Sequence, residues 1–230
     1  MLNPTLNTLI FDLDNTLIDR NNAMRLTIED WLKTQGYSEE QNNSRQLLPS
    51  LDEIMLRDRW GYTDRGEFCD WLLQNYAGAE NQENTPKRLL DYLLSNIIHH
   101  IQPDTLVNGV LRKATASYRL ILASNGGSIT QRAKLRKAQL QSFFRPGSVF
   151  ISAETGIHKP DKQFFEQIIY DLQLDPEKTM VIGDHPVNDI AAARSCGLST
   201  CWVSHGRPAA DNFMSGQVIQ NITELGQWMK

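Results

Sequence analysis

The stretch LIFDLDNT, residues 9–16, joins a short apolar run to two aspartates, Asp12 and Asp14, that stand two positions apart. In an extended chain, side chains two residues apart point to the same side, so both carboxylates face one way. Two negative charges this close repel each other, and they call for a cation or for a proton on one carboxyl. A solvated turn rich in Asp and Asn is the plainer interpretation of the same residues.

Similar apolar runs recur along the chain and indicate a parallel sheet. They occupy residues 119–123, 149–151, 180–182 and 200–203, and polar or glycine residues follow each of them. Continuous apolar runs are typical of strands covered on both faces, and the alternation with helical patterns predicts a doubly wound α/β domain. One expected helix spans residues 129–140 after a capping box at Ser128, and another begins at Asn188 or Asp189 and ends at Gly197.

Residues 19–102 interrupt this pattern. They contain no strand-like run, and their apolar residues recur at helical spacing. The pair Thr85-Pro86 is a helix start, because proline is tolerated in the first turn of a helix. We therefore expect residues 19–102 to form an all-helical insert of four or five helices, and residues 1–18 and 103–230 to form the α/β core.

Polar groups that suit a phosphate and a metal ion follow the other expected strands. Ser124 and Asn125 precede two glycines and a helix start, which is the pattern of an anion cradle. Lys159 follows the third strand, and Asp184 and Asp189 follow the fourth. Each has a plainer interpretation alone, such as a surface lysine or a helix cap. Because the carboxyl ends of parallel strands share one edge of the sheet, the groups together predict a site for a metal ion and a phosphoryl group.

These motifs resemble those of the haloacid dehalogenase (HAD) superfamily of phosphohydrolases. The resemblance covers the whole core and matches four motifs in order, namely residues 12–16 (DLDNT), Ser124, Lys159, and Gly183-Asp184 with Asp189. The insert between the first two motifs looks like the mobile α-helical cap of that superfamily. Two departures are small: a histidine stands at position 185, and the second motif begins with serine in place of threonine.

The resemblance implies a mechanism through a covalent intermediate. Asp12 would attack phosphorus and form an aspartyl phosphate, which splits one difficult step into two. Asp14 would protonate the leaving oxygen and then activate water, and its anionic surroundings would favour the proton that it must hold. Family members that attack carbon in place of phosphorus lack this second aspartate, so its presence favours phosphoryl transfer.

The resemblance also implies which residues bind the cofactor and the phosphate. Mg²⁺ is the expected cofactor, with an oxygen of Asp12, the main-chain carbonyl of Asp14 and the side chain of Asp184 as its ligands. The phosphate oxygens would be held by Ser124, the main-chain amide of Asn125, and Lys159. Around them, Asp189 would orient Lys159 or a metal-bound water, and Thr16 would brace the loop.

We expect the substrate to be a small phosphorylated metabolite. Part of the sequence is similar to the branch that contains pyrimidine 5′-nucleotidases and acylneuraminate 9-phosphate phosphatases, which suggests a nucleoside monophosphate or a sugar phosphate. A sugar phosphomutase with the same phospho-aspartate is an alternative, and a catalytically silent binding protein is another. Candidate recognition residues in the insert are Arg20, Asn21, Arg25, Arg57, Arg59, Trp60 and Tyr62.

The composition argues against several kinds of binding partner. The 230 residues carry a formal net charge of −4, which argues against non-specific nucleic-acid binding. Three cysteines without CxxC spacing form neither a disulfide framework nor a zinc site. No apolar run approaches the ~20 residues that span a bilayer, and the start lacks the pattern of a signal peptide. We therefore expect a cytoplasmic protein without a membrane partner, either a monomer or a homodimer.

Overall fold

The computed structural model describes residues 3–39, 46–78, 85–209 and 216–229. The chain divides into two compact units, one of Met1–Ile18 with Gln102–Lys230 and the other of Asp19–Ile101. The sequence predicts cuts after residues 18 and 102. The function of the second unit as a cap stays a prediction.

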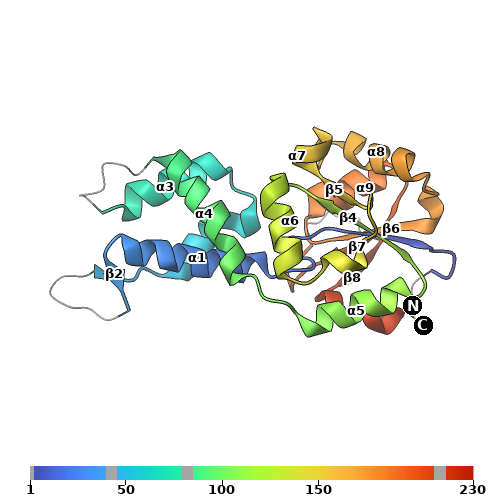
Figure 1. Ribbon diagram of the computed structural model, residues 1–230, viewed down its shortest axis with the longest axis horizontal. Coiled ribbons are helices and arrows are strands. Elements are labelled where there is room, and N and C mark those ends of the chain that lie inside the picture. The colour runs from blue at the N-terminus through green and yellow to red at the C-terminus, as the bar shows by residue number, and fades with distance from the viewer. Residues whose placement is uncertain (1–2, 40–45, 79–84, 210–215, 230) are drawn as a thin grey trace. The chain divides into compact units, whose positions relative to one another are not determined.

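The first unit is built around a parallel sheet of six strands, in the order β5-β4-β1-β6-β7-β8 (Figure 1). The strands are β1 (Thr8–Phe11), β4 (Arg119–Ser124), β5 (Val149–Ile151), β6 (Thr179–Gly183), β7 (Ser199–Val203) and β8 (Gln217–Ile219). This sheet confirms the predicted doubly wound α/β fold. The sequence analysis missed β8, an edge strand of three residues in which Val218 is half exposed.

Helices cover both faces of this sheet. Figure 1 shows α8 and α9 on one side of it and α5 on the opposite side. The helices of this unit are α5 (Thr105–Thr115), α6 (Ser128–Lys137), α7 (Ser152–Thr155), α8 (Lys162–Leu172), α9 (Ala192–Ser195) and α10 (Leu225–Trp228), with a π-helix, η4 (Pro186–Ala191), and the short 3-10 turns η2 (Gln141–Phe143), η3 (Pro176–Lys178) and η5 (Ile222–Glu224).

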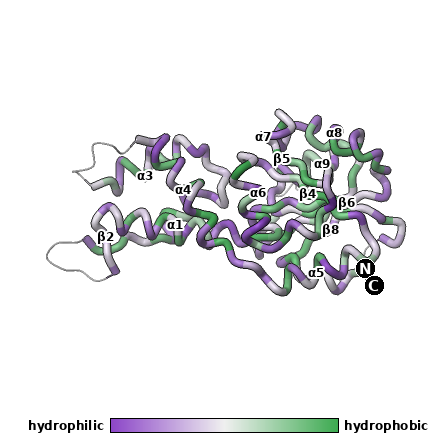
Figure 2. The backbone as a smooth tube through the Cα atoms, viewed as in Figure 1, coloured by the Kyte–Doolittle hydropathy of each residue, from purple (hydrophilic) through white to green (hydrophobic). Residues whose placement is uncertain are grey.

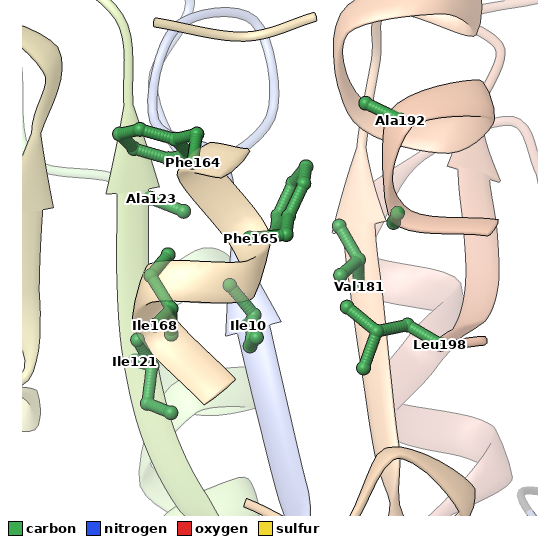
Figure 3. Packing of buried hydrophobic residues seen from close by; sticks show 10 residues of the cluster. Ile10, Ile121, Ala123, Phe164, Phe165, Ile168, Val181, Ala192 and Leu198 are labelled. Carbon is green, nitrogen blue, oxygen red and sulfur yellow. The ribbon is translucent and has the colours of Figure 1, made fainter. Parts of the chain in front are cut away.

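The core between α8 and the sheet follows from the helical spacing of its aromatic residues. Phe164, Phe165 and Ile168 of α8 form one buried cluster with side chains of the strands, among them Ile10 and Val181 (Figure 3). Burying each such side chain stabilises the fold by roughly 1.5–3 kcal/mol. Figure 2 shows the helices alternating between hydrophobic and hydrophilic positions, as amphipathic helices on a sheet do.

Two helix starts differ from the prediction. The residue that caps α6 is Gly127, without a side-chain hydrogen bond, because the Ser128 hydroxyl donates to Glu154. The predicted capping box at Ser128 is therefore wrong. The turn after β6 begins at Pro186, earlier than expected, because His185 Nδ1 accepts hydrogen bonds from two main-chain amides at 3.0 and 3.2 Å.

The second unit is mainly helical. It contains α1 (Arg20–Thr34), α2 (Leu51–Asp58), η1 (Arg59–Gly61), α3 (Arg65–Tyr76) and α4 (Pro86–His100). The predicted start of α4 is confirmed, since Thr85 caps it and Pro86 stands in the first turn. One feature departs from the all-helical expectation: β2 (Tyr37–Ser38) and β3 (Gln46–Leu47) pair as a two-residue parallel ladder. None of the helices in the described ranges has both the length and the apolar character needed to cross a bilayer.

Candidate active site

The expected polar groups lie where β1, β4 and β6 end. Strand β1 lies between the other two, with Phe11 in register with Leu122 on one side and Ile182 on the other. The chain passes from β1 to β4 and β5 on one side and then crosses to β6 on the other, so this edge is a topological switch point, where α/β sheets bind ligands. Asp12 is the first residue after β1, and its main-chain N–H donates to Ile182 O at 2.9 Å.

Lys159 joins two of the predicted carboxylates. Its ammonium donates to Asp12 Oδ1 at 2.8 Å, to Asp189 Oδ1 at 2.6 Å, and to the carbonyl oxygen of Ala123 at 2.8 Å. The lysine is only 3% exposed, so it is a buried cation with three strong acceptors and not a surface group. The structure therefore brings together the first, third and fourth sequence motifs.

The side chain of Asn125 fixes the main chain at Lys159. Its Nδ2 donates to the Lys159 carbonyl oxygen at 2.7 Å, and its Oδ1 accepts from the Lys159 amide at 2.9 Å. Only the main-chain amide of Asn125 was predicted to belong to the site. The sequence did offer one signal for this function of the side chain, namely an asparagine directly after Ser124 at the end of a strand. Its partner, Lys159, lies 34 residues away in the chain, so the pairing could not be predicted.

Burial changes the proton affinity of this pair. Burial, opposed by Lys159 and assisted by the charge of Asp189, raises the pKa of Asp12 from 3.8 to about 7. Burial lowers the pKa of Lys159, but the carboxylates of Asp12 and Asp189 outweigh it and hold that pKa above its ordinary value. Lys159 is therefore charged near neutral pH, whereas Asp12 exchanges its proton in that range.

Three buried carboxylates can hold a metal ion. One oxygen from each of Asp12, Asp184 and Asp189 lies within 4.8 Å of the others. Carboxylate oxygens are the ligands that hard divalent cations prefer. Arg207 lies beside this cluster and donates to Asp184 Oδ2 at 3.2 Å and to the Asp184 carbonyl oxygen at 2.7 Å. Arg207 was not among the residues predicted for the site.

Gly183 gives Asp189 the room that it occupies. A Cβ at position 183 would lie 2.4 Å from the Asp189 carboxyl group. The same carboxyl group accepts from Lys159 through Oδ1 at 2.6 Å and from the main-chain N–H of His185 through Oδ2 at 2.9 Å. Both Asp189 oxygens therefore have protein donors, which fits the predicted orienting function better than direct metal binding.

Asp14 has partners that the sequence analysis missed. Lys134 Nζ lies 2.6 and 2.8 Å from its two carboxylate oxygens, and Gln131 Nε2 donates to Oδ2 at 2.9 Å. The same Gln131 nitrogen also donates to Ser124 Oγ at 2.7 Å. Asp14 thus faces a cation, in contrast to the purely anionic surroundings expected for it. The signal in the sequence was a glutamine and a lysine three positions apart on the helix after the second motif.

The loop after Asp14 is held mainly through its main chain. Asn15 has a left-handed conformation with φ 60°, and its N–H donates to Ile18 O at 2.8 Å. His205 Nε2 lies 2.6 Å from the Asn15 carbonyl oxygen. Thr16 is buried here, and its hydroxyl oxygen has no hydrogen-bond partner within the described part of the chain. The Thr16 N–H donates to Leu13 O at 3.3 Å, and the bracing function of Thr16 stays a prediction.

The comparison with known families identifies the family of this chain. A model of the haloacid dehalogenase-like hydrolases matches residues 9–203, which includes every motif above. This chain belongs to that family. The resemblance drawn from the four motifs is thereby confirmed.

Several relatives of this HAD-like hydrolase match over most of its length. HAD-hydrolase YfnB of Bacillus subtilis is 26% identical over 230 residues, 95% of this chain and 93% of that protein. Pyrimidine 5′-nucleotidase PynA of Streptococcus pneumoniae is 26% identical over 84% of this chain and 82% of its own. N-acylneuraminate-9-phosphatase of Rattus norvegicus is 24% identical over 94% and 90%. The crystal structure of YfnB, bound to magnesium, has the same fold, with a TM-score of 0.71, 24% identity, and coverage of 98% and 99%.

The second unit engages some of its candidate recognition residues in internal ion pairs. Arg20 pairs with Asp58, which is fully buried and also receives Arg65 at 2.7 Å. Burial raises the pKa of Asp58, but the two arginines reverse the effect and hold it below its ordinary value. Arg57 lies 3.1 Å from an acidic partner on α3. The buried pair gives Arg20 a stabilising function in the HAD-like hydrolase, whereas the exposed pair of Arg57 contributes little to stability.

Proposed function

We propose that this HAD-like hydrolase is a Mg²⁺-dependent phosphatase that hydrolyses a phosphate monoester of a small metabolite through a phospho-aspartate on Asp12. The observation that carries the proposal is the buried ammonium of Lys159 between Asp12 and Asp189, with Asp184 completing an acidic cluster within 4.8 Å. A nucleophilic carboxylate beside a fixed cation is what phosphoryl transfer needs.

In the first half of the reaction, a carboxylate oxygen of Asp12 forms a bond to phosphorus as the bond from phosphorus to the ester oxygen breaks. Asp14 gives its carboxyl proton to the leaving oxygen, which departs as an alcohol. Ser124, the Asn125 amide and Lys159 neutralise and orient the phosphate oxygens during this step.

In the second half, the phosphoryl group passes to water. Asp14, now a carboxylate, takes a proton from the water as its oxygen bonds to phosphorus and the bond to Asp12 breaks. Inorganic phosphate leaves and Asp12 is a carboxylate again, so the cycle closes with both aspartates restored.

The donor set near Asp12 fits Mg²⁺ because it consists of hard oxygens. Asp12, Asp184 and the Asp14 carbonyl oxygen would hold the ion, and Asp189 would orient Lys159. When bound, Mg²⁺ supplies positive charge that lets the anionic phosphate approach Asp12 and favours the carboxylate form of that residue.

The substrate proposed is a nucleoside monophosphate or a sugar phosphate. The names of the pyrimidine 5′-nucleotidase and the N-acylneuraminate-9-phosphatase among the relatives support this choice. Residues 19–102 are proposed to act as the cap that supplies recognition and excludes water. Retention of Asp14 favours phosphate over halogenated substrates.

The test is hydrolysis of a panel of phosphate monoesters with Mg²⁺ or EDTA by wild type, Asp12→Asn and the exposed control Asp171→Asn. Turnover should require Mg²⁺, disappear in Asp12→Asn and persist in Asp171→Asn. Acid quenching should trap phosphate on a peptide that contains Asp12. A folded wild type that hydrolyses no ester would refute the proposal. A phospho-enzyme that resists water but passes its phosphoryl group to a sugar phosphate would identify a phosphomutase.

A further inference from the structure

Lys134 is a buried lysine for which the proposed reaction has no use. It is 5% exposed and lies on α6, a helix whose other lysine and arginine residues are exposed. Lysine is rarely buried without a specific partner, because an isolated ammonium loses its hydration. The partner here is Asp14, whose two oxygens lie 2.6 and 2.8 Å from the ammonium.

Gln131 is a second buried polar residue on the same face of α6. It is 2% exposed, and its Nε2 donates to Asp14 Oδ2 at 2.9 Å and to Ser124 Oγ at 2.7 Å. A primary amide has two N–H groups, so one nitrogen can serve both acceptors. The glutamine therefore ties the proposed acid to the hydroxyl of the proposed phosphate cradle.

Gly126 leaves the space in which this glutamine lies. Its φ is +135°, a conformation that L side chains rarely adopt. A Cβ at that position would lie 3.0 Å from the Gln131 side-chain carbon Cδ. The turn at Gly126, directly after β4, therefore leaves room for the Gln131 side chain, whatever hydrogen bonds that side chain makes.

We propose that Lys134 and Gln131 are positioning residues that fix the direction in which Asp14 transfers its proton, and that Gln131 sets this direction relative to Ser124. The inference rests on the proposed phosphatase function. Donors on both carboxylate oxygens exclude the alternative rotamers of Asp14. A catalytic group displaced by about 1 Å can lose about 100-fold in rate, so the fixed orientation has kinetic consequences.

The leaving group of the substrate separates positioning from general structural damage. An alkyl phosphate needs a proton on its leaving oxygen, whereas p-nitrophenyl phosphate releases a stable phenolate with little help. The constant kcat/KM covers the steps up to formation of the phospho-aspartate, in which Asp14 acts as the acid. Lys134→Met should therefore lower kcat/KM about 100-fold for glycerol phosphate but less than about tenfold for p-nitrophenyl phosphate.

Two further variants complete the experiment. Gln131→Met should show the same selectivity without removing a charge, and it serves as the test if Lys134→Met does not fold. Lys137→Met removes an exposed lysine from the same helix and should leave both constants unchanged. In an Asp14→Asn background, Lys134→Met should cause no further loss with p-nitrophenyl phosphate, since a positioning residue acts only through the residue that it holds.

The outcomes distinguish this inference from the function on which it rests. Equal losses with both esters, no loss, or a loss that persists in the Asp14→Asn background would overturn the positioning function while the phosphatase stands. A folded wild type that hydrolyses neither ester with Mg²⁺ would refute the phosphatase proposal and the positioning function together.

Discussion

Asp12 is a buried carboxyl group, and replacing it tests the electrostatics of the site without any substrate. Burial is the largest influence that raises the pKa of Asp12 from 3.8 to about 7. The folded protein thus holds this proton more tightly than the unfolded chain does. A group of this kind makes the free energy of unfolding fall as pH rises from 3.8 towards about 7. The amide in Asp12→Asn carries no such proton, so the variant should lack this loss.

The magnitude follows from the two pKa values. At 1.36 kcal/mol per pKa unit, the difference between 3.8 and about 7 corresponds to about 4 kcal/mol above neutral pH. Asparagine has nearly the same shape, and its carbonyl oxygen can still accept from Lys159. The metal-free variant should therefore gain stability over wild type as pH rises, although it loses all turnover.

The assay is urea unfolding in EDTA at a series of values from about pH 4.5 to about pH 8.5, for wild type, Asp12→Asn and Asp171→Asn. Subtracting the wild-type curve from each variant curve removes the contributions that the other titrating groups make to the pH dependence of the free energy of unfolding. The difference for Asp12→Asn should grow with pH by about 4 kcal/mol, far more than that for the exposed control Asp171→Asn. Added Mg²⁺ should shrink the first difference, because a bound cation favours the Asp12 carboxylate.

Two results would refute the reasoning. A flat difference for Asp12→Asn would mean that folding leaves the proton affinity of Asp12 unchanged. A difference that falls with pH would mean that Lys159 outweighs burial and lowers the pKa of Asp12.

Three other perturbations have defined outcomes. Asp58→Asn should destabilise the protein by about 3–5 kcal/mol in urea unfolding, because it leaves a buried arginine unpaired; an effect below about 1 kcal/mol would mean that the pair behaves as a surface ion pair. If Mg²⁺ binds as proposed, Gly183→Ala should reduce the rise in Tm on adding Mg²⁺, since its Cβ would lie 2.4 Å from the Asp189 carboxyl and would displace the residue that holds Lys159 beside Asp12. An unchanged rise would contradict this. Burial raises the pKa of Cys201 to about 12. Iodoacetamide at about pH 8 should therefore modify the half-exposed Cys196 before Cys201. The reverse order would contradict the burial of Cys201.

Much of the α/β fold could be predicted because its strands are continuous apolar runs. A strand covered on both faces excludes polar residues, so β1 and β6 stand out from the chain around them. The edge strand β8 did not, because it is short and exposes Val218, which leaves no run to recognise. Its place in the sheet is set by pairing with β7, in which Val218 lies opposite Trp202, and this pairing leaves no local pattern in the sequence.

The carboxylates of the site and Lys159 could also be predicted, whereas Lys134, Gln131 and Arg207 could not. Parallel strands end at one edge, so Asp12 and Asp184 were expected to meet there. Lys134 belongs to a helix whose basic residues suggest a solvated face, and only the packing of α6 shows that it is buried. Ser128 was misassigned because a capping box is a local pattern, while its acceptor, Glu154, lies 26 residues away.

The charges of the site explain why a proton and a divalent cation would compete for Asp12. Within the described residues, Lys159 neutralises part of the Asp12 and Asp189 pair, Lys134 faces Asp14, and Arg207 faces Asp184. Before Asp14 takes up the proton that it gives to the leaving oxygen, four carboxylates face three cations, and this excess negative charge opposes an incoming phosphate. A proton on Asp12 removes this excess but also blocks the nucleophile. The proposed Mg²⁺ removes it and leaves the nucleophile ionised, so the same cation that admits the phosphate keeps Asp12 ready to attack it.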